Sequence, residues 1–274
     1  DEHYEEDLAK LQAKFKQVID QSVRQIAILA DDFWNPGGQN GLRLLNDMTE
    51  WLKEVKKEYP DMKMTIPYVP YDYMGNGSSQ ELQILKQAPD NVQIVMTGGR
   101  VWGEVTDNFT STFTNNVGRG PFMWINWPCT DNSKKHLIMG GYDTFLHPGV
   151  EPSKIQGIML NPMQQSEPSK VAIFGNASYA WNIWETKEEA EEIWNASFSF
   201  VDHNSAISNE ASDALREMSK HMINQAMDSR VTALQESVVL KEELNGFKEK
   251  LEAETLTAAD VDAMIEEFEL LQEA

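Results

Sequence analysis

Apolar residues along the first two thirds of the chain follow two alternating spacings. Short continuous apolar runs, typical of buried strands, alternate with stretches in which apolar residues recur every three or four positions, as in amphipathic helices. The predicted strands are residues 23–30, 64–69, 92–96, 122–127 and 155–160. The predicted helices are residues 4–19, 42–55, 79–87 and 106–116, and one more that begins after residue 166. This alternation is typical of parallel strands covered by helices.

Three of these segments carry mixed signals. Pro67 interrupts the second strand, and a proline cannot donate a backbone hydrogen bond to a neighbouring strand. Residues 106–116 are rich in Thr and Asn, which are poor helix formers. Ser166 is a good N-cap with Pro168 two positions on, which favours a helix start at that point.

The strand pattern stops at about residue 186, and only helices are predicted beyond it. They cover residues 187–198, 209–231 and 232–251, with an interruption near Asn245 and Gly246, followed by a last helix. That helix begins with Thr257 and Asp260 in the spacing of a capping box. We therefore predict two domains, an α/β domain of residues 1–185 and an α-helical domain of residues 186–274.

Polar residues follow the end of nearly every predicted strand. They are Asp31 and Asp32, Tyr71 and Asp72, Gly98 to Arg100, Asn126 to Asp131, and Asn161. In a (β/α) barrel the functional groups come from the C-terminal ends of many strands, whereas an open doubly wound sheet uses one or two. The pattern therefore predicts an α/β fold that is the C-terminal portion, about strands 4–8, of a (β/α)8 TIM barrel, followed by an α-helical appendage.

Composition and charge narrow the class of ligand. The net charge of -21 disfavours nucleic acid and anionic membrane surfaces as partners. No run reaches the roughly 18 apolar residues of a membrane span. Cys129 is the single cysteine, so no internal disulfide forms, and the five histidines have no metal-ligand spacing. We expect no metal and no cofactor.

Two kinds of residue at the strand ends point to a sugar as the ligand. Two adjacent carboxylates, Asp31 and Asp32, repel each other when both are ionised, which favours a form with one proton, as a general acid requires. The alternative is a pair that caps a loop or the next helix. Aromatic rings suit the apolar faces of a sugar, although several could instead belong to the core. These rings are Trp34, Tyr68, Tyr71, Tyr73, Trp102, Trp124, Trp127 and Tyr142.

The adjacency of Asp31 and Asp32 restricts the chemistry. Ordinary glycoside hydrolysis needs two carboxylates about 5 to 9 Å apart on opposite sides of the bond. Neighbouring residues of a strand point to opposite faces and fit that geometry poorly. If the 2-acetamido oxygen of the substrate is the nucleophile, one carboxylate serves as acid and base and the other orients the acetamido group.

Five motifs in order resemble those of glycoside hydrolase family 84, the retaining β-N-acetylglucosaminidases that include O-GlcNAcase and bacterial enzymes labelled hyaluronidase. They lie at residues 28–33, 65–67 with 71–72, 124–131, 161–163 and 180–182. The resemblance spans about residues 4 to 200. It implies hydrolysis of terminal N-acetylglucosamine by substrate-assisted catalysis through an oxazoline.

The resemblance also implies roles for the acid pair and for a tyrosine. Asp31 would orient and polarise the acetamido group, and Asp32 would act as general acid and then as general base. Tyr71 would hydrogen-bond near the reacting centre. The preceding segment departs from the commoner family pattern, so Tyr68 and Tyr73 stay open as alternatives to Tyr71.

Four further residues are implied to bind the sugar. Trp124 would form a wall of the acetamido pocket, and Asn126 would bind the substrate beside it. Asp131 would hold the 4- and 6-hydroxyls, and Asn161 would contact a ring hydroxyl. Gly120 stands where some family members have Asn, which removes one secondary contact.

The resemblance further implies a longer parent protein. The first barrel strands, which supply a glycine and a lysine to the sugar in this family, are not in this chain, so we expect the missing barrel half from the parent and weak activity without it. The motifs resemble those of secreted enzymes of Gram-positive bacteria, which implies an extracellular or cell-surface location. O-GlcNAc on protein, mucin-type glycans and N-glycan ends are all compatible substrates, whereas hyaluronan is disfavoured by its negative charge.

Two other hypotheses stay open. One is a sugar-binding or scaffolding module that keeps the barrel without catalysis; retention of Asp31 and Asp32 speaks against it. The other makes the helical segment from Ser208 onward the functional part, which would dock a protein partner.

Overall fold

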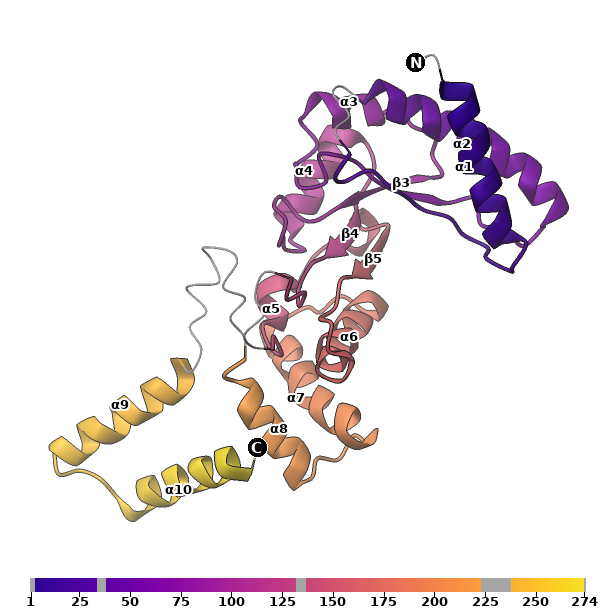
Figure 1. Cartoon of the computed structure of the whole chain (residues 1–274). Coiled ribbons are helices and arrows are strands. Elements are labelled where there is room, and N and C mark those ends of the chain that lie inside the picture. Colours follow the sequence, from indigo (N-terminus) through magenta and orange to yellow (C-terminus); the bar gives the residue numbers. More distant parts are fainter. Residues whose placement is uncertain (1–2, 34–37, 132–136, 223–237, 274) are drawn as a thin grey trace. The chain divides into compact units, whose positions relative to one another are not determined.

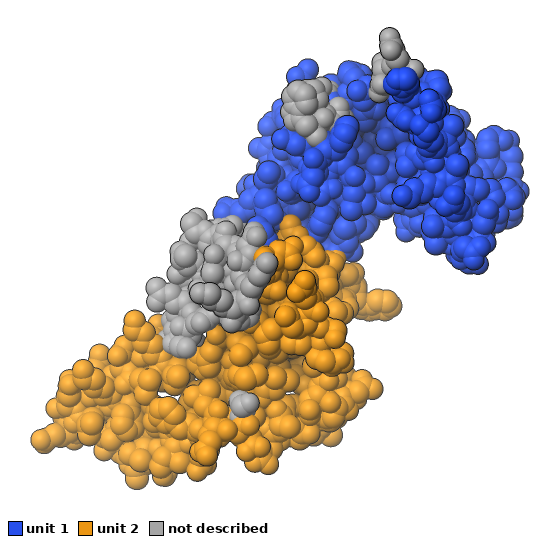
Figure 2. All heavy atoms as spheres, viewed as in Figure 1, with its two compact units in different colours: residues 1–124, 151–159 blue, residues 125–150, 160–274 orange. Residues whose placement is uncertain are grey.

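A computed structural model describes residues 3–33, 38–131, 137–222 and 238–273 (Figure 1). The chain forms two compact units (Figure 2). Unit 1 consists of residues 1–124 and 151–159, and unit 2 of residues 125–150 and 160–274. The predicted domain boundary between residues 185 and 186 stays a prediction. Within the described residues, no helix combines the length and the apolarity that a membrane crossing requires.

Along the described residues, strands and helices alternate through β5, and only helices follow it. The strands are β1 (Ile28–Leu29), β2 (Ile66–Val69), β3 (Val92–Met96), β4 (Phe122–Ile125) and β5 (Gly157–Leu160). The helices up to β5 are α1 (Tyr4–Ile19), α2 (Gln39–Glu58), α3 (Gln80–Leu85), α4 (Asp107–Val117), α5 (Tyr142–Phe145) and the 3-10 turn η1 (Pro152–Lys154). The later helices are α6 (Ser166–Trp181), α7 (Lys187–His203), α8 (Glu210–Ser219), α9 (Val238–Glu252) and α10 (Ala258–Glu273).

The five strands form one sheet in the order β1-β2-β3-β4-β5. β1 pairs with β2, β2 with β3 and β3 with β4, each in parallel. Next to β4, the backbone N–H of Gln156 donates to the carbonyl of Pro121 at 2.9 Å. The predicted α/β fold with a parallel sheet is confirmed. Pro67 lies inside β2, in register with Gln93 of β3.

The first strand is shorter than its apolar run predicts, because only Ile28 and Leu29 have strand geometry. Two further backbone bonds continue the contact with the β2 segment: the N–H of Lys63 donates to the carbonyl of Arg24, and that of Ala30 to Val69, at 2.8 and 2.9 Å. Among the described residues, β1 has no strand on its other side. Leu29 is 60% exposed, so this edge of the sheet is apolar and open.

The core of unit 1 lies between the sheet and its helices. α2 presents a stripe of apolar residues at helical spacing, including Leu45, Met48 and Leu52, all fully buried. Ile66 of β2 and Ile94 of β3 are also fully buried. Removing such side chains from water is the main favourable term in folding.

α4 forms where propensity alone disfavours a helix. The hydroxyl of Thr106, its N-cap, accepts a hydrogen bond from the backbone N–H of Phe109 at 3.0 Å. Gly118 ends the helix in a left-handed conformation, with φ +81°. Phe109 and Phe113 are buried on the inner face of the helix, so caps and packing together offset its poor propensity.

Unit 2 has an aromatic core. The ring of Trp127 lies edge-on to Tyr142 at 5.5 Å and stacks on Phe145 at 5.6 Å, and Tyr142 stacks on Trp184 at 5.7 Å. The indole N–H of Trp127 donates to the carbonyl of Gly140 at 2.8 Å. Trp127 and Tyr142 are therefore core residues, the structural alternative left open for them.

Three helix details differ from or match the predicted pattern. α6 begins at Ser166 itself, so its N-cap is Gln165, and the predicted cap is wrong by one residue. α9 continues through Asn245 and Gly246, so the predicted interruption is wrong. The capping box at the start of α10 is confirmed, because the N–H of Thr257 donates to the Asp260 carboxylate and the N–H of Asp260 to the Thr257 hydroxyl. Residues 223–237 of the predicted helices lie outside the described residues.

Candidate active site

The acid pair lies where β1 ends. The backbone N–H of Phe33 donates to the carbonyl of Ala30 at 3.1 Å, which forms a turn around Asp31 and Asp32. Asp31 is half-buried and Asp32 is exposed. The turn breaks the alternation of a regular strand, so the two carboxylates are not forced onto opposite faces of the sheet. Trp34 lies outside the described residues.

The three candidate tyrosines after β2 differ in exposure. Tyr68 is fully buried within β2, so it cannot reach a ligand at the surface. Tyr71 is 44% exposed. Tyr73 is half-buried, and its ring stacks on Trp124 of β4 with 6.5 Å between ring centroids. Unit 1 therefore brings Tyr73 and the predicted pocket wall Trp124 together.

Tyr73 also lies in the field of the acid pair. Burial raises the pKa of the Tyr73 hydroxyl, and the negative charges of Asp32 and Asp31 raise it further. The charges act in this direction because they disfavour a phenolate nearby. Tyr73 therefore keeps its proton and can donate a hydrogen bond beside Asp31 and Asp32.

The segment that carries these tyrosines is fixed at two points. The carboxylate of Glu81, in α3, accepts hydrogen bonds from the backbone N–H of Tyr71 at 3.1 Å and of Asp72 at 2.8 Å. The backbone N–H of Thr97 donates to the carbonyl of Tyr73 at 2.9 Å. The sequence prediction missed Glu81, although it precedes Leu82 and lies four residues before Leu85, on the buried face of α3.

Two predicted binding residues meet within unit 2. The side-chain amide of Asn161 donates to the side-chain oxygen of Asn126 at 3.0 Å. The backbone N–H of Asn161 donates to the carbonyl of Ile125 at 2.8 Å, which sets Asn161 beside the end of β4. Asn126 is 7% exposed. Together the two side-chain amides can offer hydrogen-bond donors and acceptors to a ligand rich in hydroxyl groups.

Asp131 follows on the exposed end of the same segment. The N–H of Cys129 donates to the carbonyl of Asn126 at 2.8 Å, which turns the chain between these two candidates. Burial raises the pKa of the Cys129 thiol, and Asp131 lies close enough to hydrogen-bond it. Asn126, Asp131 and Asn161 are thus held by contacts within unit 2, whereas Asp31, Asp32, Tyr71 and Trp124 belong to unit 1.

The departure at Gly120 has a steric reason. A Cβ at Gly120 would come within 2.1 Å of the carbonyl oxygen of Lys154, so this backbone admits no side chain. Asn at this position would require the η1 segment to move.

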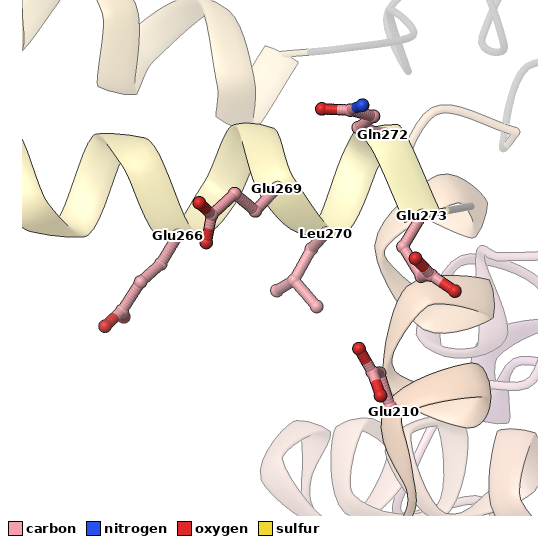
Figure 3. A pocket seen from close by; sticks show the side chains of 6 residues that line it. All are labelled: Glu210, Glu266, Glu269, Leu270, Gln272 and Glu273. Atoms are coloured by element: carbon pink, nitrogen blue, oxygen red, sulfur yellow. The ribbon is translucent and has the colours of Figure 1, made fainter.

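A hollow of about 600 Å³ between α8 and α10 is lined by acidic residues (Figure 3). Its residues are Glu210, Glu266, Glu269, Leu270, Gln272 and Glu273. None of them is a predicted site residue, and repulsion among the carboxylates makes the hollow unsuited to an anion. Among the residues that the structure describes, no group of three or more His, Cys, Asp or Glu side chains is placed to hold a metal ion.

Comparison with known proteins identifies the family. The family model for β-N-acetylglucosaminidase matches residues 2–220. The chain belongs to the β-N-acetylglucosaminidase family. The resemblance to glycoside hydrolase family 84 is confirmed by the structural neighbours, which are enzymes of that family.

Three solved structures define this likeness. CpGH84D is 30% identical over 99% of this chain, with a TM-score of 0.81. CpGH84B is 22% identical over 97% of the chain, with a TM-score of 0.72. A mutant of the O-GlcNAc hydrolase of Thermobaculum terrenum is 20% identical over 98% of the chain, with a TM-score of 0.63. The chain spans 43%, 45% and 57% of these three proteins, respectively.

Proposed function

We propose that this chain carries the catalytic residues of a retaining exo-β-N-acetylglucosaminidase that acts by substrate-assisted catalysis. The observation that carries the proposal is the acid pair at the end of β1 in a member of this family, with Tyr73 in the field of both carboxylates. Two adjacent carboxylates suit a mechanism in which the acetamido group, not the enzyme, supplies the nucleophile.

The chemistry divides between the two carboxylates. Asp31 orients the acetamido group and balances the positive charge of the forming oxazolinium ion. Asp32 protonates the leaving oxygen and then takes a proton from the water that opens the oxazoline, so the product keeps the β configuration. Tyr73 or Tyr71 donates a hydrogen bond at the reacting centre. Trp124 forms the apolar wall of the acetamido pocket.

Polar side chains after β4 and β5 bind the sugar hydroxyls in this proposal. Asn126 and Asn161 present a shared amide pair, and Asp131 is an exposed acceptor for the 4- and 6-hydroxyls. Paired donors and acceptors suit a terminal sugar, whose hydroxyls must be satisfied once it leaves water. Terminal N-acetylglucosamine on a glycan or glycoprotein is the substrate class.

The five strands are, in the same proposal, about strands 4–8 of a (β/α)8 barrel. The parallel order β1-β2-β3-β4-β5, the open apolar edge of β1 and the 43% span of CpGH84D support it. The remaining strands come from the parent protein, for which we propose an extracellular or cell-surface location. The chain alone should then hydrolyse a chromogenic N-acetylglucosaminide much more slowly than the full-length parent, and equal rates would contradict the partial barrel.

The decisive test of the mechanism measures kcat for a series of aryl β-N-acetylglucosaminides whose acetamido methyl group carries an increasing number of fluorine atoms. Fluorine withdraws electrons from the acetamido oxygen, so kcat should fall steeply along the series if that oxygen is the nucleophile. Asp32→Asn should lower kcat/KM about 10²- to 10⁴-fold and keep binding of an oxazoline mimic. A kcat that does not change with the number of fluorine atoms would contradict substrate-assisted catalysis. Unchanged turnover in Asp32→Asn would contradict the assignment of Asp32 as the acid.

The terminal helices favour a second candidate function, the docking of a protein partner. No residue of α10 is buried, and Val261, Ile265 and Phe268 on its apolar face are exposed. Removing the chain from Ser208 onward separates the two functions: activity should survive if the barrel alone is catalytic, and any partner binding should be lost.

A further inference from the structure

We propose that Glu81 is a positioning residue for this reaction: it fixes the segment that carries Tyr71 and Tyr73 against Gly38, the N-cap residue of α2. The expected effect on kcat rests on the proposed function, whereas the expected effect on the Tyr71 segment concerns the structure of unit 1 alone. No role for Glu81 follows from the sequence motifs.

The first observation is the geometry of the Glu81 carboxylate. One oxygen accepts from the N–H of Tyr71 at 3.1 Å and the other from the N–H of Asp72 at 2.8 Å. A carboxylate that accepts two successive backbone N–H groups fixes the direction of that peptide as well as its position. Rotation of the Tyr71 segment would break both bonds together.

The Glu81 side chain is also buried. Glu81 is 5% exposed, and glutamate is rarely this buried unless its carboxylate has partners. Burial raises the pKa of Glu81, whereas the two backbone bonds lower it. Water cannot replace these bonds readily at so buried a site, so the loss of either leaves a backbone N–H without its acceptor.

Glu81 also lies against the start of α2. Gly38, which precedes α2, has φ +73° and lies against Glu81. A Cβ at Gly38 would come within 3.1 Å of the Cα, Cγ and carbonyl oxygen of Glu81. Glu81 therefore lies against Gly38 at the start of α2 and binds the backbone of Tyr71 and Asp72.

The fixed segment also carries Tyr73. Two residues after Tyr71, the ring of Tyr73 stacks on Trp124 and its hydroxyl lies in the field of Asp32 and Asp31. Thr97 holds the carbonyl of Tyr73, and the N–H of Gly75 donates to the carbonyl of Asp72 at 3.3 Å, but neither bond engages the N–H groups of Tyr71 and Asp72. Glu81 supplies the missing constraint.

The test compares Glu81→Gln with wild type in the full-length protein. Glutamine has nearly the same shape, but its NH₂ group faces one of the two N–H donors. Hydrogen exchange of the 71–73 amides should accelerate at least tenfold, while exchange in α2 stays unchanged. With an aryl β-N-acetylglucosaminide, kcat should fall about 10- to 100-fold with little change in KM, because misplacement affects the transition state more than binding.

The control variant is Glu54→Gln, an exposed glutamate of α2 that pairs with Lys57 and should leave both readouts at wild-type values. Glu81→Asp is the second variant; it keeps the charge but shortens the reach, and should accelerate the same amides if Glu81→Gln does not fold. Wild-type exchange at residues 71–73 in the folded variant would overturn the inference. So would a lower melting temperature with unchanged kcat per folded molecule, because that result means a structural role only.

The two proposals fail in distinguishable ways. If wild-type protein does not hydrolyse the substrate, the proposed function fails, whereas the exchange of the 71–73 amides still tests the role of Glu81. If wild type is active and Glu81→Gln keeps either its kcat or its amide protection, the inference about Glu81 fails alone.

Discussion

A tyrosine next to an acid pair helps catalysis only if its hydroxyl keeps its proton. Tyr73 meets this condition as an ordinary tyrosine does near neutral pH, and burial together with the charges of Asp32 and Asp31 raises its pKa further. Its ring stacks on Trp124, with 6.5 Å between the ring centroids. Tyr71 is more exposed and lacks such a ring contact among the described residues. For the proposed mechanism we therefore infer that Tyr73, not the fully buried Tyr68, is the alternative to Tyr71 as hydrogen-bond donor.

Removing the Tyr73 hydroxyl tests this preference. Tyr73→Phe keeps the ring against Trp124 but loses the donor, so kcat/KM for an N-acetylglucosaminide should fall about tenfold or more. Tyr71→Phe should have a smaller effect. Steady-state kinetics of both variants in the full-length protein provide the measurement.

Tyr59→Phe is the matched control, because Tyr59 bonds Asp20 on the outside of unit 1. It should leave kcat/KM unchanged. A larger loss in Tyr71→Phe than in Tyr73→Phe would return the role to Tyr71, the residue that the sequence motifs favour.

The sequence predicted candidate site residues only where they directly follow the end of a predicted strand. Asp31 and Asp32 stand out because two charges end an apolar run, and Asn161 because it follows β5. Glu81 gives no such signal, since its function depends on backbone N–H groups that no side-chain pattern encodes. Trp127 gave a false signal. Like Trp124 it follows the pattern of a sugar-binding ring in the sequence, but its side chain lies in the core of unit 2.

At the scale of elements, α4 depends on its cap. Thr106→Ala removes the acceptor for the Phe109 N–H and should lower the free energy of unfolding by about 1 kcal/mol. Thr106→Ser keeps the hydroxyl and should cost little. Urea unfolding followed by circular dichroism measures both, and equal stability of the two variants would show that packing alone maintains α4.

Two glycines should respond oppositely to alanine. Gly120→Ala places a Cβ against the Lys154 carbonyl and should destabilise the protein by about 1–3 kcal/mol. Gly246 lies inside α9 with no atom in the way of a Cβ, so Gly246→Ala should stabilise that helix by up to about 1 kcal/mol. Thermal unfolding compares them; destabilisation by Gly246→Ala would mean that α9 needs the glycine.

The elements themselves followed largely from apolar spacing, and the errors have local causes. β1 has strand geometry at two residues of an eight-residue apolar run, because pairing exists on one side only among the described strands. The predicted break in α9 relied on a glycine that a helix tolerates at modest cost. α5 follows Gly141 in a long loop where apolar periodicity is too short to read.

At the scale of the whole molecule, a carboxyl pair makes the packing of α10 on α8 depend on pH. A hydrogen bond to Glu217, together with burial, raises the pKa of Glu267 to about 7, whereas the pKa of Glu217 is lowered despite its burial. Lys220 lies 2.5 Å from Glu217 and 3.7 Å from Glu267, and Glu243 adds a further negative charge. One proton shared by the two carboxyls therefore stabilises the contact.

The raised pKa sets the sign of the effect. The stabilisation by protonated Glu267 is complete below its ordinary pKa of 4.5 and is lost as pH rises through about 7. Hydrogen exchange of α10, corrected for the intrinsic rate, should therefore show less protection at pH 8 than at pH 6. Glu267→Gln should remove this difference and the exposed Glu269→Gln should keep it; a persistent difference in Glu267→Gln would assign it to another group.

Unit 1 is discontinuous in the chain, and this affects the order of events during synthesis. Residues 1–124 emerge from the ribosome before the segment that contains β5, because residues 125–150 of unit 2 lie between the two parts of unit 1. Until then the ring of Phe122, against which Gly157 finally packs, and the hydrogen-bonding edge of β4 stay uncovered. Such an edge invites pairing with other nascent chains. A ribosome that pauses between residues 125 and 150 would therefore prolong the interval in which unit 1 is most prone to aggregate.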